Sequence, residues 1–192
     1  MDAADVLDFW FGAPGDAERG TARAVWFRKD PAFDAAIRDR FAPLVERALR
    51  GELESWAADA EGALAEILVL DQFTRNIFRD TPRAFAGDPR ALAAASAMVG
   101  RRADARLPGF MRGFVYLPFE HAESMPAQDE AVRLFTALAT EGGEGAVQML
   151  DYAHRHRVVV ERFGRFPHRN AILGRRSTAE EEAFLREPGS GF

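Results

Sequence analysis

Polar side chains interrupt an apolar stripe in the segment 59–79, where helical spacing otherwise predicts a buried helix. Asp71 and Arg75 project from the middle of that stripe, four residues apart, when the segment is plotted at about 100° per residue. Three further polar residues flank the pair: Gln72, Asn76 and Arg79. Because an isolated buried charge is very costly, Asp71 and Arg75 must either pair or face a cavity. The segment therefore predicts an internal Asp–Arg clamp between helices or one wall of a polar pocket.

A histidine and a glutamate break the apolar pattern of a second expected helix, 145–163. His154 and Glu161 fall on the face that Val147 and Val158 mark as apolar. A carboxylate next to an imidazole raises its pKa and fixes its tautomer. We therefore expect an inward-facing His–Glu pair, with a hydrogen-bonded core histidine as the simpler alternative.

A third group of acids and bases lies in the segment 109–124. Glu120 and Glu123 are about 60° apart on a helix and could enter one cavity, whereas His121 points away from Glu123. Pro118 leaves open which glutamate faces inward. Together with His154, the glutamates form a candidate acid–base set, because burial beside a second carboxylate raises one pKa towards neutrality. A metal site built from Glu120, Glu123 and His154 is the less favoured alternative. No HExxH spacing occurs, and we expect neither a metal nor a cofactor.

The densest cationic segment of this acidic chain is an expected turn over residues 162–176. Gly164 and Pro167 favour a fixed turn after the long helix. The turn holds Arg162, Arg165, Arg169, Arg175, Arg176, His168 and Asn170. Arginine forks suit a phosphate or carboxylate, although a solvated surface that balances the acidic run 179–182 is the alternative. Neither a phosphate-binding glycine loop nor a GxSxG serine elbow is present.

Helices are expected almost everywhere, because apolar residues recur at helical spacing and alternation typical of strands is missing. The expected helices cover about 3–11, 18–28, 31–50, 59–79, 88–101, 109–124, 127–140, 145–163 and a short segment that begins at Ser177-Thr178. Asp30-Pro31 is a helix start, and Gly142-Gly143 is a break. The sequence predicts an all-α array of antiparallel helix pairs with short connections.

Composition narrows the class of protein. The 192 residues are 47% hydrophobic with a net charge of −5, which predicts one folded domain over 1–192 and argues against disorder. A membrane span is not expected, because no run of about 18 apolar residues occurs. The acidic balance argues against nucleic acid as a partner. Cysteine is absent, and acidic residues precede the first apolar run, so we expect no secretory signal and a cytoplasmic location.

Three long segments resemble one known family. The segments are LDQFTRNIFRD, VYLPFEHAES and VERFGRFPHRNAILGRRSTAEEEAFL. In their order and amino-acid sequence they resemble the bacterial domain of unknown function 924, and the likeness extends over nearly the whole chain. The matching positions are Asp71, Gln72, Arg75, Asn76, Arg79, Glu120, His121, Glu123, Arg165, His168, Arg169 and Asn170. The resemblance implies an all-α, tetratricopeptide-like right-handed superhelix and implies no activity.

Four functions compete on these observations. A polar pocket that binds a small anionic ligand or peptide ranks first. The alternatives are a hydrolase-type enzyme with Glu120 or Glu123 and His154 as acid and base, a tetratricopeptide-like interaction scaffold, and purely internal pairing. Exposed Trp10, Trp26 or Trp56 would favour the scaffold. The expected ligand-binding residues are Asp71, Gln72, Arg75, Asn76, Arg79, His121, Glu161, Arg165, His168, Arg169 and Asn170. The ligand and the oligomeric state are not predicted.

Overall fold

The computed structural model describes residues 1–17, 19–142 and 145–191, and these residues form helices and turns without a β-strand. The α-helices are α1 (Ala3–Phe11), α2 (Pro31–Leu49), α3 (Ala60–Leu68), α4 (Thr74–Ile77), α5 (Asp88–Gly100), α6 (Gly109–Glu120), α7 (Met125–Glu141), α8 (Ala146–Phe163) and α9 (Ala179–Phe184). The all-α prediction is therefore confirmed. Over the described ranges, none of these helices is long and apolar enough to cross a membrane.

Helix starts follow the capping residues in the sequence. The Asp30 carboxylate accepts hydrogen bonds from the backbone N–H groups of Ala32 and Phe33, and Pro31 fills the first helical position of α2. At α9, Thr178 and Glu181 form a reciprocal capping box. Of the two residues expected to begin this helix, Ser177 and Thr178, the cap is Thr178.

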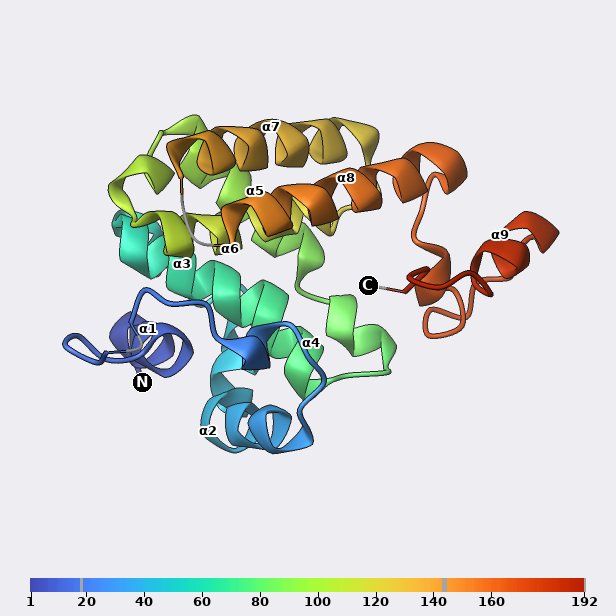
Figure 1. The fold of residues 1–192 in the computed structure, drawn as a ribbon. Helices are drawn as coiled ribbons and strands as arrows, with labels where there is room; N and C mark the ends of the chain where they lie inside the picture. Colours follow the sequence, from blue (N-terminus) through green and yellow to red (C-terminus); the bar gives the residue numbers. More distant parts are fainter. Residues whose placement is uncertain (18, 143–144, 192) are drawn as a thin grey trace.

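The helices pack in two groups that share α3 (Figure 1). Helices α6, α7 and α8 lie side by side in the upper part of the view, each against the next along the chain. Helices α1 and α2 lie below, and α3 contacts α1, α5 and α6. One apolar cluster runs from α1 to α8, and a smaller one joins the end of α8 to the segment that leads to α9.

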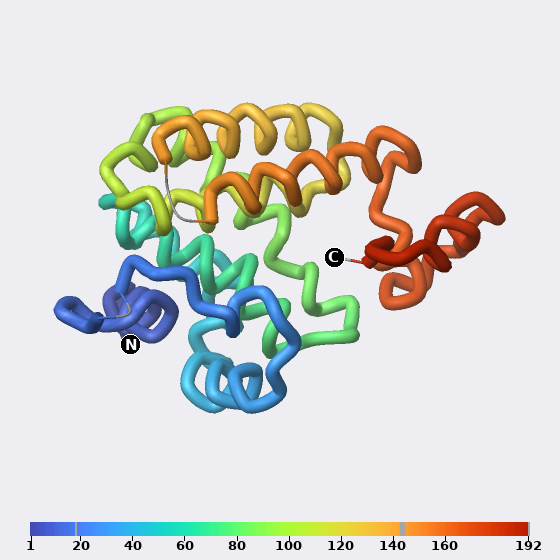
Figure 2. Tube along the Cα trace, viewed as in Figure 1, coloured from blue at the N-terminus to red at the C-terminus, as the bar shows by residue number. Residues whose placement is uncertain are grey.

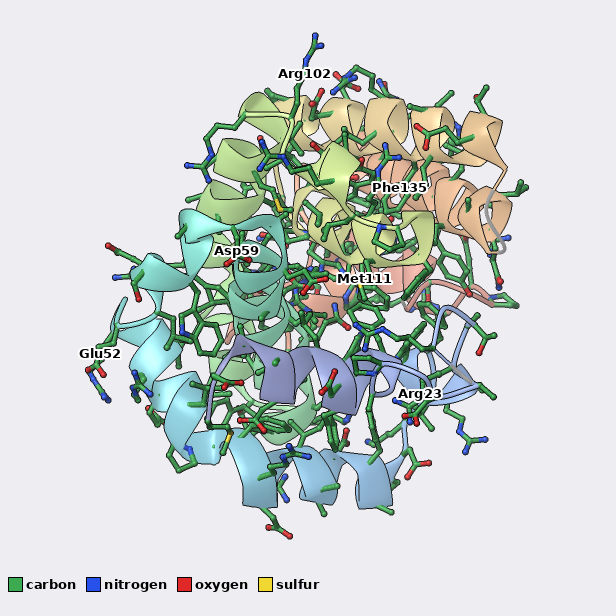
Figure 3. All side chains as sticks on the ribbon, turned by 90° about the vertical axis from the view of Figure 1, so that its left-hand side faces the viewer. Arg23, Glu52, Asp59, Arg102, Met111 and Phe135 are labelled. Atoms are coloured by element: carbon green, nitrogen blue, oxygen red, sulfur yellow. The ribbon has the colours of Figure 1, made fainter. Side chains whose placement is uncertain are left out.

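Aromatic side chains fill the part of the core around α1. Trp10 is 1% exposed and packs against Phe73 and Phe114. Trp26 and Trp56 are partly buried against the same cluster. The three tryptophans therefore do not form the exposed patch that would have favoured an interaction scaffold. Figure 3 shows Met111 near the middle of the molecule, whereas Glu52 and Arg102 reach its edges.

The helix predicted over 18–28 does not form in its described part, where only Ala24–Trp26 make a single 3₁₀ turn. Glu18 lies outside the described residues. Instead, side chains tie this segment to the end of α1. Arg23 donates hydrogen bonds to the carbonyl oxygens of Phe9 and Trp10, and the Trp26 indole donates to that of Trp10. Tertiary hydrogen bonds thus replace the intrahelical ones that the pattern suggested.

Two other signals from the sequence have mixed outcomes. Helix α6 begins at Gly109, where the expected helix 109–124 begins, and it continues through Pro118 to Glu120. Gly142 ends α7 in the left-handed region at φ 79°, as a break requires. Gly143, the second half of that break, lies outside the described residues.

The buried face of α8 is not the one that the sequence pattern indicated. Val147 is 71% exposed and Val158 is 58% exposed, and His154 and Glu161 are also exposed. The inward side carries Ala146, Ala153, His156 and Val160. Both sides of α8 carry apolar residues, and the small alanines let α7 and α6 approach closely on the second side. The prediction of an inward-facing His154–Glu161 pair is wrong.

Candidate functional site

A π-helical turn lies at the centre of the polar site. Helix α3 runs without interruption through this turn, Val69–Phe73, into α4. Asp71 is in the middle of the turn and is fully buried. Such single π-turns often occur at functional sites, because the extra residue redirects side chains. Asp71 and Arg75, four residues apart, lie on the same side of the helix and pair at 2.9 Å.

Gly87 lets the start of α5 approach this turn. A Cβ atom on Gly87 would lie 2.1 Å from the carbonyl oxygen of Leu70, inside the π-turn. Asp88, the first residue of α5, is thereby brought beside Arg75. Close backbone contact at a glycine therefore adds a second carboxylate to the site.

The Asp71 carboxylate is the best-bonded group of the site. Its Oδ1 accepts from Arg75 Nη1 at 2.9 Å and lies 2.8 Å from His121 Nδ1, and its Oδ2 accepts from Gln72 Nε2 at 2.6 Å. Burial alone would raise the pKa of Asp71, but the Arg75 charge and the hydrogen bonds from His121 and Gln72 hold it well below its usual range. Asp71 is therefore ionised at neutral pH.

Two arginines share the second carboxylate. Arg75 Nη2 donates to Asp88 Oδ2 at 3.0 Å, and Arg169 Nη1 lies 3.6 Å from the same oxygen. Figure 2 shows why residues 81 positions apart meet: the segment after α8 comes down beside the segment that precedes α5. Burial raises the pKa of Asp88, with a further rise from Asp71 and an opposing fall from Arg75.

Arg169 is buried without a hydrogen-bond acceptor for its side chain among the described residues. Its side chain is 8% exposed, its Nε has no partner, and its closest carboxylate oxygen is the Asp88 atom at 3.6 Å. The guanidinium instead lies over the rings of Phe166 and Phe85, 4.5 and 4.8 Å from their centroids. Burial, together with the Arg75 charge, lowers the pKa of Arg169 to about 10.

A glutamic acid and a histidine form the inner end of the site. Glu120 Oε1 lies 3.2 Å from His156 Nδ1, which is also 2.9 Å from the Tyr152 carbonyl oxygen. Glu120 Oε2 is buried with no partner among the described residues. Burial and the nearby Asp71 charge raise the pKa of Glu120 to about 8. Glu120 is therefore mostly protonated at neutral pH.

The three histidines of the site are neutral at pH 7. Burial lowers the pKa of His121, lowers that of His156 to about 3 and lowers that of His168 to about 4. The His121 and His156 rings lie 6.3 Å apart, and Phe166 separates His156 from His168 at 5.4 and 5.7 Å. The formal charges of the site are therefore those of two arginines and two aspartates.

Part of the site is exposed to solvent. The side chains of Arg75 and Asp88 are each 20% exposed and that of His121 is 16% exposed, whereas Glu120 is nearly fully buried. Two hollows of about 520 and 240 Å³ lie elsewhere, beside α1 and beside the start of α3.

Comparison with known proteins places the chain in a family. Residues 6–189 match the model of a family described as "Bacterial protein of unknown function (DUF924)". The chain belongs to this family. It is also similar to a solved structure, that of the protein of unknown function ATU0120 from Agrobacterium tumefaciens, with 44% identity, a TM-score of 0.83 and 96% of each chain covered. Among curated proteins, none matches significantly.

Several residues that the DUF924 motifs contribute lie in ion pairs outside the central site. Asn76 and Arg79 both donate to the Asp34 carboxylate of α2, Arg79 with two hydrogen bonds of 2.8 Å. Glu123 accepts from Arg175 at 2.6 and 2.9 Å and from the Phe166 backbone N–H. These contacts join α2 to α4 and the residues just after it, and they join the segment after α8 to the connection between α6 and α7.

Two further predicted residues stabilise the segment before α9. Arg165 donates to both carboxylate oxygens of Glu181, at 2.6 and 2.8 Å, and Asn170 bonds Ser177 and Arg175. The hydrogen bonds from Arg165, opposed by partial burial, lower the pKa of Glu181 to about 2. Arg169 and His168 are the members of this arginine-rich turn that reach the central site.

His154 is separate from the acids it was expected to join. It lies on the outer face of α8, where Glu161 pairs with Arg157 at 3.0 Å. The metal site proposed from Glu120, Glu123 and His154 is therefore not assembled. Within the described ranges, no three histidine, aspartate or glutamate side chains come together in a way that could hold a metal ion.

Sequence reasoning missed two members of the site. Asp88 was predicted only as the first residue of the helix 88–101, whereas in the structure its carboxylate pairs with Arg75. His156 lies two residues from His154 on the opposite face of α8, and the choice between them depended on which side of α8 is buried. The DUF924 motifs did not include either residue.

Proposed function

We propose that this DUF924 protein binds a small anion, or the anionic end of a peptide, beside Arg169 and Arg75. One observation carries the proposal: the Arg169 guanidinium is buried and lacks a hydrogen-bond acceptor among the described residues. Buried polar groups are nearly always hydrogen-bonded, and a buried charge without such bonds is costly. A carboxylate or phosphate offers the acceptors that a guanidinium fork requires.

The surroundings of Arg169 favour a ligand over a purely internal pair. Asp88 accepts a hydrogen bond from Arg75 at 3.0 Å but lies 3.6 Å from Arg169. The Asp88 carboxylate is therefore hydrogen-bonded to Arg75 and too far from Arg169 for a hydrogen bond. Protonated Glu120 adds a donor whose Oε2 has no partner in the described structure. An anion that enters at the edge formed by Arg75 and Asp88 would accept from Arg169 and displace Asp88 from part of its contact.

Thermal unfolding with added anions tests this proposal. Inorganic phosphate and citrate are the probes, and a ligand at 100 times its Kd should add about 2.7 kcal/mol to the free energy of unfolding. Arg169→Gln should lose the shift. Arg162→Gln, which alters an exposed arginine paired with Glu180, should retain it. The proposal fails if the wild-type protein responds to neither probe, or if Arg169→Gln responds as the wild type does.

An acid–base enzyme is a second candidate, favoured by Glu120. A carboxyl group with its pKa raised to about 8 beside an imidazole suits proton donation near neutral pH. His156 takes the part first assigned to His154, and Glu123 is occupied by Arg175. The test is to compare the Glu120→Gln variant with the wild-type protein in anion binding and in any activity that the wild type shows. If the variant binds the anions normally and keeps the full activity, this candidate should be abandoned.

The proposal also includes a tetratricopeptide-like arrangement of helix pairs and a cytoplasmic location. Its support is the order of packing, in which α5 contacts α6, α6 contacts α7 and α7 contacts α8. The location rests on the absence of cysteine in the sequence. An experimental structure in which successive helix pairs superpose by one repeated rotation would support the arrangement, and unrelated pair geometries would contradict it.

A further inference from the structure

The outer face of α8 carries apolar and charged residues along a single line. Val147 and Val158 are among the most exposed large apolar side chains of the described residues, at 71% and 58%. Eleven residues are close to three full turns, so the two valines project from the same side. Asp151 and His154, both exposed, lie between them on that line. Figure 1 shows α8 at the surface of the upper helix group.

The spacing of these four residues is that of a coiled-coil seam. Positions 147, 151, 154 and 158 are separated by four, three and four residues, which is the alternation of core positions in a heptad pattern. The opposite side of α8, with Ala153 and His156, is buried. Among the described residues, the seam is therefore exposed.

The order of residues along the seam is complementary to itself. When two copies of α8 run antiparallel about a two-fold axis between residues 152 and 153, position 147 faces 158 of the second copy. Position 151 then faces 154. The apolar residues thus meet each other, and Asp151 meets His154. Isologous contacts of this kind build two-fold dimers.

We propose that two copies of this chain associate in antiparallel fashion through the outer face of α8, with Val147 against Val158 and Asp151 against His154. The arginines beside the seam are already paired within each copy. Arg155 pairs with Asp151 at 2.7 Å, and Arg157 pairs with Asp129 at 2.7 Å. Acids on and next to the seam, Asp151 and Glu161, disfavour a lipid surface as the occupant.

A seam of this length makes a weak dimer. Eleven residues of helix extend about 16 Å, so the buried area falls below the roughly 1,200–2,000 Å² that is typical of stable specific interfaces. Association should therefore depend on protein concentration. Sedimentation velocity over a wide concentration range should show a monomer–dimer equilibrium.

Cysteine pairing tests the register, because the natural chain contains no cysteine. In a dimer of the Val147→Cys variant alone, or of the Val158→Cys variant alone, the sulfur atoms of the two copies would lie about 16 Å apart along the seam. That distance is too long for a disulfide bond. A mixture of the two variants should form a covalent heterodimer under mild oxidation, whereas each variant alone should not. Equal cross-linking in all three samples would overturn the proposed register.

A charge placed in the seam tests the surface itself. Val158→Glu should shift the equilibrium to monomer at every concentration, with helix content and melting temperature unchanged because Val158 is exposed. Phe27→Glu is the matched control, since Phe27 is 63% exposed and distant in sequence from α8. A wild-type protein that stays monomeric, or a dimer unaffected by Val158→Glu, would refute the proposal. Neither result bears on anion binding.

Discussion

His121 Nδ1 lies 2.8 Å from Asp71 Oδ1, although 50 residues separate the two in the chain. This contact joins the end of α6 to the π-turn. His121 is neutral, because burial lowers its pKa despite the opposing charge of Asp71. Its Nδ1–H therefore donates to the carboxylate, and its Nε2 is left as an acceptor. The pair fixes one tautomer and holds the imidazole in place at the edge of the site.

Asp71→Asn should destabilise the protein strongly. The substitution removes one of the two carboxylate charges that compensate the largely buried Arg75, and breaking such a buried pair costs about 3–5 kcal/mol. Asp80→Asn is the control, because Asp80 pairs with Lys29 at the surface and surface pairs contribute little. Denaturant unfolding at pH 7 measures both. A loss below about 1 kcal/mol for Asp71→Asn would show that Asp71 does not anchor the site.

Gly87→Ala should also destabilise the protein, through a backbone collision. The new Cβ would lie 2.1 Å from the Leu70 carbonyl oxygen, a backbone atom that cannot rotate away. Forced shifts of this kind cost about 1–3 kcal/mol. On the same helix, Gly100 has open space around it, so Gly100→Ala should be neutral or stabilise by up to about 1 kcal/mol. Thermal unfolding of the two variants makes the comparison. Equal melting temperatures would contradict the close approach of α5 to the π-turn.

The sequence predicted helices well where local signals and packing agree. Asp30-Pro31 began α2 and Gly142 ended α7, because capping and left-handed backbone are decided by a few adjacent residues. The segment 18–28 was mispredicted, because hydrogen bonds from Arg23 and Trp26 to α1 are long-range and leave no periodic signal.

The site was predictable in part for the same reason. Asp71 and Arg75 stood out because charges inside an apolar stripe need partners wherever the helix packs. The choice between His154 and His156 depended on which side of α8 meets α7, and small alanines on one side decided it. The role of Asp88 depended on Gly87 passing close to Leu70. Neither tertiary contact is encoded in the spacing of a single helix.

His156 should make the protein sensitive to acid. Burial holds the pKa of His156 at about 3 in the folded state, against 6.5 for an ordinary histidine. Below pH 6.5, His156 therefore binds a proton in the unfolded chain but stays neutral in the folded protein, so the free energy of unfolding decreases as the pH falls. His156→Gln should flatten the dependence of unfolding free energy on pH between 6.5 and 4. His154→Gln, on the exposed face, is the control. Identical slopes for the wild-type protein and His156→Gln would exclude this source of acid sensitivity.

Glu120 should produce the opposite dependence at higher pH. Its folded pKa is about 8 and its ordinary value is 4.5, so the folded protein keeps a proton that the unfolded chain releases. Stability should fall by up to about 1.4 kcal/mol for each pH unit from 5 to 8, and the fall should cease above 8. Glu120→Gln resembles the protonated acid in shape and cannot ionise, so it should remove this slope and leave the protein more stable than the wild type at pH 8. Exposed Glu161 supplies the matched control in Glu161→Gln. Denaturant unfolding at several pH values compares the three proteins, and a wild-type slope retained in Glu120→Gln would show that Glu120 is ionised in the folded state.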